Sequence, residues 1–280
     1  MSGDPYRTAD HFSASLRLGF EVVTTPRPAL SDADRRRLAA TFNTAAELFA
    51  RARPGYAPDA VTWLLPATAH RVVDLGAGTG LLTAALVIRG LDVIAIDPSP
   101  AMLDQLRAQL PTVDARHGYA ERTGLPDDSV DAMVIGEALH WFERPAADRE
   151  IARILRWHGV VGIFGHERDA AVPWVAALND LLEKRFEGVA RPSAATSLPP
   201  LSTSFFTAPE RATFPHTQRL DAESLADLIA SRSYVIALSE DERNDLLDEV
   251  RHFARNHPDL SGRDWFEMPY LTTVLRCYRR

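Results

Sequence analysis

Three glycines and two aspartates are the residues whose types and spacing most clearly indicate chemistry. Gly76, Gly78 and Gly80 follow an apolar run in the segment VVDLGAGTG, and Asp74 ends that run two residues before the first glycine. Asp97 ends the next apolar run. Glycines at the end of a strand permit a tight turn and let a ligand approach the backbone closely. The spacing therefore predicts a nucleotide site at one edge of a sheet.

The same residues discriminate between two nucleotide ligands. A dinucleotide fingerprint reads G-x-G-x-x-G, and Leu81 stands where its third glycine is required. A carboxylate at Asp74 is badly placed beside a pyrophosphate and well placed beside a positively charged ligand. S-adenosylmethionine carries an ammonium and a sulfonium and no phosphate, and Asp97 can bind its ribose hydroxyls. The pattern favours S-adenosylmethionine over NAD, with a cap at Asp74 and an Asp-Pro turn at Asp97 as the structural alternatives.

Composition limits the classes of partner. The chain has 280 residues, 46% of them hydrophobic and 25% charged, and a formal net charge of −7. This charge would repel a polyphosphate backbone, so nucleic acid is not an expected partner. The first residues lack a signal-peptide pattern and no apolar run could span a bilayer, so we expect a cytoplasmic protein without membrane contact.

Cysteine and histidine usage argues against a metal centre. Cys277 is the single cysteine, which rules out an internal disulfide and a multi-thiolate site, and its apolar surroundings predict a buried thiol. The nine histidines and the acids show no recognisable ligand spacing. We therefore expect no metal, and a monomer or homodimer.

Alternating segments predict the elements that position the glycines and acids. Strands are expected at residues 71–74, 93–96, just before His117, and at 130–135, 160–164, 211–220 and 270–278. Helices are expected at residues 38–52, 81–89, 100–110, 143–157, 174–186 and 222–231. Gly90 and Gly159 are expected to end two of these helices. The order predicts an α/β fold, a Rossmann-like, mostly parallel seven-stranded sheet with helices on both faces.

The segments VVDLGAGTG and IAIDPSPAML resemble the first two motifs of the class I S-adenosylmethionine-dependent methyltransferases. The resemblance covers residues 40–165 well and the C-terminal third loosely. It implies S-adenosyl-L-methionine as methyl donor and S-adenosyl-L-homocysteine as product. The residues it implies for the methionine and ribose parts of the donor are Asp74, Gly76, Ala77, Gly78, Gly80, Asp97 and Pro98. It also places Met102 against the adenine, with core packing as the alternative.

The segment HGYAERTGLPDDSVDAMVI resembles the third motif region of this family. Tyr119 occupies the position where an aspartate often binds the adenine. The backbone of Ala120 or the side chain of Glu121 is therefore expected to supply this contact. A solvated surface position is the alternative for Glu121.

Two further segments resemble small-molecule methyltransferases, the trans-aconitate methyltransferase group among them. The helix from Phe42 followed by RPGY resembles their F-x-x-x-A-x-x-Y-x-x-x-R-P-x-Y segment, with Phe49 in place of the tyrosine. This resemblance implies that Phe42, Arg53 and Tyr56 belong to a cover over the donor. Packing of the turn is the alternative for Tyr56.

The segment EALHWF resembles the His-Trp motif that these enzymes carry after the fourth strand. It implies that Glu137, His140 and Trp141 shape the acceptor site, with Trp141 beside an acceptor carboxylate. Core packing is the alternative for His140 and Trp141.

Local composition and periodicity, together with the resemblance, divide the chain. Residues 1–31 are expected to be an N-terminal extension and 32–280 the methyltransferase domain. Within that domain we expect a cover helix and turn at 32–56, with Ser31 or Asp32 as its cap, and the cofactor-binding core at 70–165. Residues 166–280 would supply a cap and the last strands, including a lid-like insertion at 187–204.

The expected reaction is metal-free methyl transfer to an oxygen, carboxylate or hydroxyl, of a small-molecule acceptor. A carboxylate is ionised at neutral pH and needs no base, whereas a hydroxyl or amine would need His140 or His166. A catalytically silent S-adenosylmethionine-binding module and an NAD-dependent reductase are the alternatives. The reductase is disfavoured by Leu81 and by the lack of a Tyr-x-x-x-Lys pair, since Lys184 is the single lysine.

Overall fold

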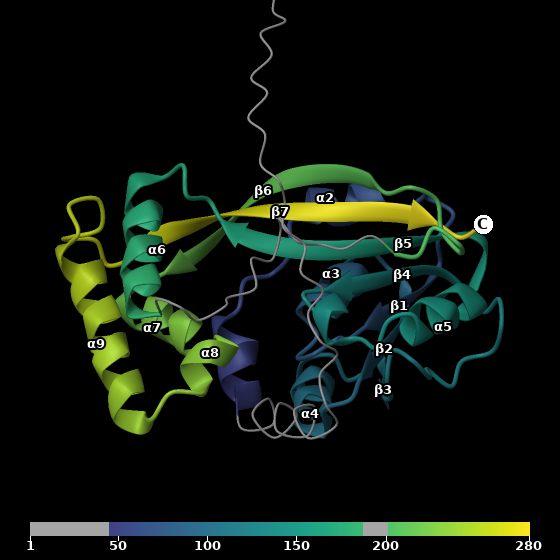
Figure 1. Ribbon diagram of the computed structural model, residues 1–280, viewed down its shortest axis with the longest axis horizontal. Coiled ribbons are helices and arrows are strands. Elements are labelled where there is room, and N and C mark those ends of the chain that lie inside the picture. Colours follow the sequence, from purple (N-terminus) through teal and green to yellow (C-terminus); the bar gives the residue numbers. More distant parts are fainter. Residues whose placement is uncertain (1–44, 187–200) are drawn as a thin grey trace, which may run out of the picture.

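One seven-stranded sheet organises the computed structural model, which describes residues 45–186 and 201–280 (Figure 1). Its spatial order is β3-β2-β1-β4-β5-β7-β6. The strands are β1 Arg71–Leu75, β2 Asp92–Asp97, β3 Asp114–His117, β4 Val130–Gly136, β5 Leu155–Arg168, β6 Glu210–Leu220 and β7 Phe266–Tyr278. The strands from β3 to β5 pair in parallel, and β7 pairs antiparallel with both β5 and β6. The predicted α/β fold with a mostly parallel sheet is confirmed.

Helices cover both faces of the sheet. They are α2 Pro58–Leu64, α3 Leu81–Ile88, α4 Pro100–Gln109, α5 Ala146–Ile154, α6 Pro173–Arg185, α7 Ala222–Ala230, α8 Ser233–Ile236 and α9 Glu240–Asn256. Val72 and Val134 pack with residues of α2 and α3, whereas the alternate residues Val73 and Ile135 pack with residues of α5. Strands buried on both faces are continuously apolar, which is why β1 and β4 were recognisable from the sequence.

A separate cluster of helices lies at one end of the two long antiparallel strands. Figure 1 shows α6 to α9 together where β6 ends and β7 begins. Trp174, Leu228 and Leu246 from these helices share one hydrophobic cluster with Tyr270 of β7. We call α6 to α9 the cap. A hydrogen bond from Arg51 to Asp227 joins the helical segment at residues 45–52 to α7 of the cap.

The helix predicted at residues 143–157 is shorter than expected. α5 ends at Ile154 and β5 begins at Leu155, with an irregular register opposite Asp131. A Cβ on Gly159 would lie 2.8 Å from the carbonyl oxygen of Arg156. The prediction that Gly159 ends a helix was wrong, because this glycine permits a bulge within the strand.

Some predictions fall outside the described residues. These are the extension at 1–31, the cap at Ser31 or Asp32, Phe42, and residues 187–200 of the expected lid. The described part of the cover helix, residues 45–52, is helical as predicted. In residues 45–186 and 201–280, no helix combines the length and apolarity needed to cross a membrane. The cytoplasmic location stays a prediction.

Candidate active site

A cavity of about 370 Å³ opens where β1, β2 and β4 end. Its lining includes Asp97, the last residue of β2, and Gly76 and Glu137, which directly follow β1 and β4. The chain reverses its direction of strand addition between β1 and β4, which is where open α/β sheets bind ligands. The volume lies within the range of small-molecule sites.

The glycine loop adopts a backbone conformation that other residues rarely take. Gly76 and Gly78 have φ angles of 76° and 55°. A Cβ on Gly76 would lie 2.5 Å from the Cβ of Ala138, so only glycine lets the β4 loop approach this closely. Gly76, Ala77 and Gly78 line the cavity, whereas Gly80 is the N-cap of α3 and lies outside the lining. Glycine is required at position 80 for packing, because a Cβ there would lie 2.7 Å from Cγ of Leu106.

Asp97 is buried and fastens two loops of the site. Its Oδ2 accepts a hydrogen bond of 2.8 Å from the N–H of Gly78, and its Oδ1 accepts one of 2.8 Å from the N–H of Ser99. Burial raises the pKa of this carboxyl, and the two hydrogen bonds oppose that rise.

Asp74 is also buried at the cavity, where its Oδ2 accepts a 2.6 Å hydrogen bond from the Thr83 hydroxyl. Burial raises the pKa of Asp74 to about 7, and the charge of Asp97 adds to the rise. Two buried carboxyls at one cavity fit a ligand with positive charge, because a nearby cation favours their ionised forms. The ammonium and sulfonium of S-adenosylmethionine meet this requirement.

The adenine end of the predicted site is lined by Pro98, Met102, Ala120 and Glu121. The carboxylate of Glu121 accepts a 2.5 Å hydrogen bond from the N–H of Glu143. Glu121 is thus partly committed to the loop after β4, which favours the Ala120 backbone for the expected adenine contact.

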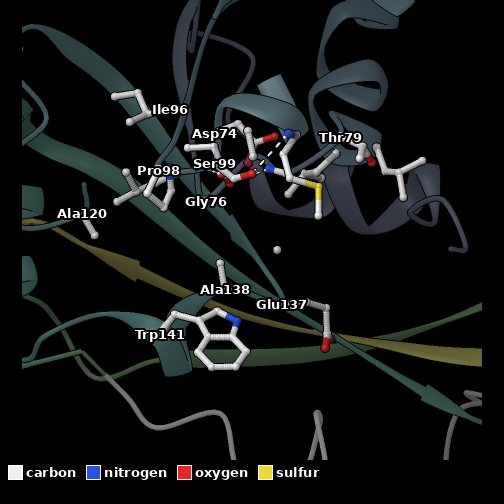
Figure 2. Close-up of a pocket in the computed structure, with 18 of the residues that line it drawn as sticks. Asp74, Gly76, Thr79, Ile96, Pro98, Ser99, Ala120, Glu137, Ala138 and Trp141 are labelled. Carbon is white, nitrogen blue, oxygen red and sulfur yellow. Dashed lines mark hydrogen bonds between the residues drawn. The ribbon is translucent and has the colours of Figure 1, made fainter. Parts of the chain in front are cut away.

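Glu137 and Trp141 lie across the cavity from the donor-side residues. Figure 2 shows Asp74 and Gly76 on one side of an open space and Glu137 and Trp141 on the other. Glu137 has a φ of 55°, a strained conformation for a bulky residue. Its Oε1 accepts a 2.6 Å hydrogen bond from the N–H of His166. Burial raises the pKa of Glu137, against the opposing charges of Arg232 and Arg53.

His140 lies outside the cavity, contrary to the place the resemblance implied beside the acceptor. It is exposed and its ring packs on Trp141, with centroids 4.5 Å apart. The cause is the 3-10 turn Leu139–Trp141, whose successive side chains point about 120° apart. Leu139 enters the core and Trp141 enters the cavity, so His140 points to solvent.

Tyr56 reaches the cavity beside Gly136. A Cβ on Gly136 would lie 2.9 Å from Cζ of Tyr56 and closer still to its hydroxyl oxygen. The Tyr56 ring also contacts the His166 ring, with centroids 4.4 Å apart. Gly136 therefore sets how deeply Tyr56 enters the site.

Two further residues line the cavity, of which Arg232 was not predicted and His166 was expected only as a candidate base. Arg232, which directly precedes α8, lines the cavity and was not predicted. His166 lines it as well, and its Nδ1 lies 3.0 Å from the Thr272 hydroxyl. Burial, followed by the nearby charges of His216, Arg232 and Arg53, lowers the pKa of His166 to about 3. No local sequence signal marks Arg232, because the packing of the cap brings it to the site.

Comparisons with known proteins agree with this geometry. A family model described as a methyltransferase domain matches residues 73–163. An uncharacterized methyltransferase of Mycobacterium tuberculosis is 42% identical over 242 residues, covering 86% of this chain and 97% of that protein. The malonyl-[acyl-carrier protein] O-methyltransferase of Halorhodospira halophila is 36% identical over 147 residues, covering 48% of this chain and 50% of that protein. A solved structure described as a type II methyltransferase from Anaeromyxobacter dehalogenans has a TM-score of 0.58 and 22% identity, covering 81% and 96% of the two chains, and supports the fold alone.

The chain therefore belongs to the class I S-adenosylmethionine-dependent methyltransferases. Its methyl donor is S-adenosylmethionine and its product is S-adenosylhomocysteine. The matches do not favour a reductase or a silent binding module. The narrower resemblance to trans-aconitate methyltransferase stays a prediction.

Proposed function

We propose that this methyltransferase transfers the methyl group to an oxygen, carboxylate or hydroxyl, of a small-molecule acceptor. The observation that carries the proposal is one cavity that joins the buried acids Asp74 and Asp97 to an opposite wall containing Glu137 and Trp141. The relative from Halorhodospira halophila is an O-methyltransferase by name, which supports oxygen as the methylated atom.

The donor side of the cavity is proposed to hold S-adenosylmethionine through the predicted residues. The donor supplies a methyl carbon activated by a sulfonium. Each carboxylate oxygen of Asp97 accepts one backbone hydrogen bond and has a further lone pair for a ribose hydroxyl. Asp74 supplies negative charge to the cationic methionine part, and the glycine loop lets that part approach the backbone.

The acceptor side is proposed to align the nucleophilic oxygen and exclude water. Trp141, Phe142 and Tyr56 give it apolar walls, which promote methyl transfer by orientation and desolvation. A carboxylate acceptor needs no base. His166 is a poor base at neutral pH, because its pKa of about 3 gives it little affinity for a hydroxyl proton. Glu137, whose pKa is raised, is the better base for a hydroxyl acceptor.

Labelled turnover tests this proposal. The full chain is incubated with methyl-labelled S-adenosylmethionine and a pool of small carboxylic acids and hydroxylated metabolites. We expect label in an O-methyl product. Mild alkali then separates the two acceptor classes, because methyl esters release labelled methanol and methyl ethers do not. Label on nitrogen or carbon would contradict oxygen transfer. Donor binding without any transfer would support the silent module.

A further inference from the structure

Two guanidinium groups line the cavity and retain unpartnered nitrogen atoms. Arg53 follows the helical residues 45–52, and its Nη2 donates a 2.7 Å hydrogen bond to the carbonyl of Ser231. Arg232 is the next residue of the cap. Within the described parts of the chain, the buried Nε atoms of both arginines have no hydrogen-bond partner. A buried donor without a partner is costly, so these atoms indicate a place for an acceptor group of a ligand.

The two arginines also create a local excess of positive charge. Burial, and next the charge of Arg232, lower the pKa of Arg53 to about 9. The charges of both arginines lower the pKa of Glu137 and so oppose its rise by burial. One oxygen of Glu137 already accepts a hydrogen bond from the N–H of His166. Among the residues that line this end of the cavity, two guanidinium groups thus face one carboxylate, which leaves net positive charge on the lining; Glu167, whose charge also acts on Glu137, lies outside the lining. An anionic ligand group would neutralise this positive charge.

The placement of Arg232 favours the acceptor over the donor. Its charge acts on Glu137, His166 and Tyr270, which belong to the ends of β4, β5 and β7. Asp74, on the donor side, responds instead to the charge of Asp97. The positive end of the cavity is therefore the end bordered by the cap.

We propose that Arg232, with Arg53 beside it, binds a carboxylate of the methyl acceptor and makes the enzyme selective for small carboxylic acids. The proposal rests on the proposed function and narrows its acceptor class. A guanidinium presents several N–H donors in a planar fork that matches a carboxylate. Phe49, Tyr56 and Trp141 line the same cavity and offer apolar surface to the body of such an acid.

Transfer to such an acceptor balances without a base. A carboxylate oxygen forms the bond to the methyl carbon while the carbon–sulfur bond breaks, and its electron pair goes to sulfur. No proton moves. The methyl ester that forms is neutral and loses the ionic attraction to Arg232. This loss favours release of the ester over rebinding.

Binding of matched probes to the protein saturated with S-adenosylhomocysteine tests the proposal. Benzoate and hexanoate are compared by calorimetry with benzamide and hexanamide, which have similar shapes and no charge. We expect the acids to bind at least about tenfold more tightly than the amides, the scale of a charge-assisted hydrogen bond. Arg232→Gln should remove this difference, and Arg232→Lys should keep part of it. Both variants should bind S-adenosylhomocysteine within about twofold of the wild type.

The surface variant Arg263→Gln is the matched control, because Arg263 is exposed and outside the cavity lining. Equal binding of acids and amides by the wild type would overturn the proposal. So would an Arg232→Gln variant that loses S-adenosylhomocysteine but keeps the preference for acids. Failure of the proposed function can be distinguished from failure of this proposal. In that case carboxylates would still bind through Arg232, but the labelled donor would give no O-methyl product.

Discussion

The N–H of Gly78 donates a 2.8 Å hydrogen bond to the carboxylate of Asp97, which fastens the glycine loop after β1 to the end of β2. The other oxygen of the same carboxylate accepts from Ser99 at the start of α4. One side chain thus holds the two loops that border the donor side of the cavity. A substitution at Asp97 would therefore affect both the shape of the glycine loop and the proposed hydrogen bonds from Asp97 to the ribose.

The substitution Asp97→Ala is expected to weaken S-adenosylmethionine binding by about 1.5 to 3 kcal/mol, the scale of charge-assisted hydrogen bonds. Calorimetry with S-adenosylmethionine and with NAD measures it. Asp92→Ala is the control, since Asp92 is exposed at the start of the same strand, and it should leave donor affinity unchanged. Binding of NAD in place of S-adenosylmethionine by the wild type would contradict the assignment of the donor.

The affinity for S-adenosylmethionine is expected to rise between pH 5 and pH 7. Because the pKa of Asp74 is raised to about 7, its carboxyl is mostly protonated at pH 5 and gains its charge as the pH approaches 7. A cationic ligand prefers the ionised form, so affinity should increase by at most about tenfold per pH unit and then level off. An α-amino group stays protonated over this range. Calorimetry at several pH values should show a flatter profile for Asp74→Asn, and an identical profile would refute this role.

The apo protein should show the opposite trend with pH. A raised carboxyl pKa means that the folded state binds the proton more tightly than the unfolded state. The contribution of Asp74 to the free energy of unfolding is therefore greatest below its usual pKa of 3.8 and declines as the pH rises towards 7. Denaturant unfolding of the wild type and Asp74→Asn should diverge along this range, with the variant lacking the decline. If the free energies of unfolding of the two proteins varied with pH in parallel, the raised pKa of Asp74 would be contradicted.

The contact between Gly136 and Tyr56 can be tested by a double-mutant cycle. Gly136→Ala should destabilise the protein by about 1 to 3 kcal/mol, because its Cβ would collide with the Tyr56 hydroxyl and overpack the site. Tyr56→Phe removes that hydroxyl and should reduce the penalty. Gly55→Ala is the control, since a Cβ there meets no atom within 4 Å. Additive effects in the cycle would mean that the two residues do not interact.

The helical segment before Tyr56 is expected to become more protected when the product binds. It is joined to the cap by an ion pair between Arg51 and Asp227 and by the hydrogen bond from Arg53 to the carbonyl of Ser231. A third anchor is the hydrogen bond that Gln218 of β6 donates to the carbonyl of Ala52. So few anchors predict easier opening than in the sheet, and ligand contacts should order the segment. Hydrogen exchange of residues 45–56 with and without S-adenosylhomocysteine measures this. Equal protection of this segment with and without S-adenosylhomocysteine would contradict its ordering by the ligand and leave it a purely structural role.

The core of the fold was predictable because its signals are local. The apolar runs of β1 and β2 and the glycines between them lie within a short stretch of chain, so their spacing predicted a nucleotide site at this edge of the sheet, and the resemblance added further residues to it. Two helices that were not predicted, α2 and α9, nevertheless carry local sequence signals. Pro58 occupies the first position of α2, and Ser239 with Glu242 forms a capping box at the start of α9.

The acceptor side was less predictable because it depends on contacts between distant segments. Arg232 reaches the cavity only through the packing of α7 and α8 against the ends of β6 and β7. His140 shows the reverse case, a residue suggested by a motif that the local 3-10 turn directs to solvent. The helix predicted at residues 143–157 was also too long. The bulge at Gly159 depends on pairing with the neighbouring strand β4, and helical periodicity carries no signal of that pairing.

A single-turnover measurement tests the central claim, that the cavity bordered by Asp74 and Asp97 holds the donor whose methyl group is transferred. Protein in excess is loaded with ¹³C-methyl S-adenosylmethionine, mixed with the acceptor pool, and quenched for mass spectrometry. We predict equal amounts of S-adenosylhomocysteine and of a small product carrying the labelled O-methyl group. At donor concentrations below saturation, Asp97→Ala should form both products at least about tenfold more slowly than the wild type. Donor bound with no S-adenosylhomocysteine formed, or transfer by Asp97→Ala as fast as by the wild type, would contradict the account.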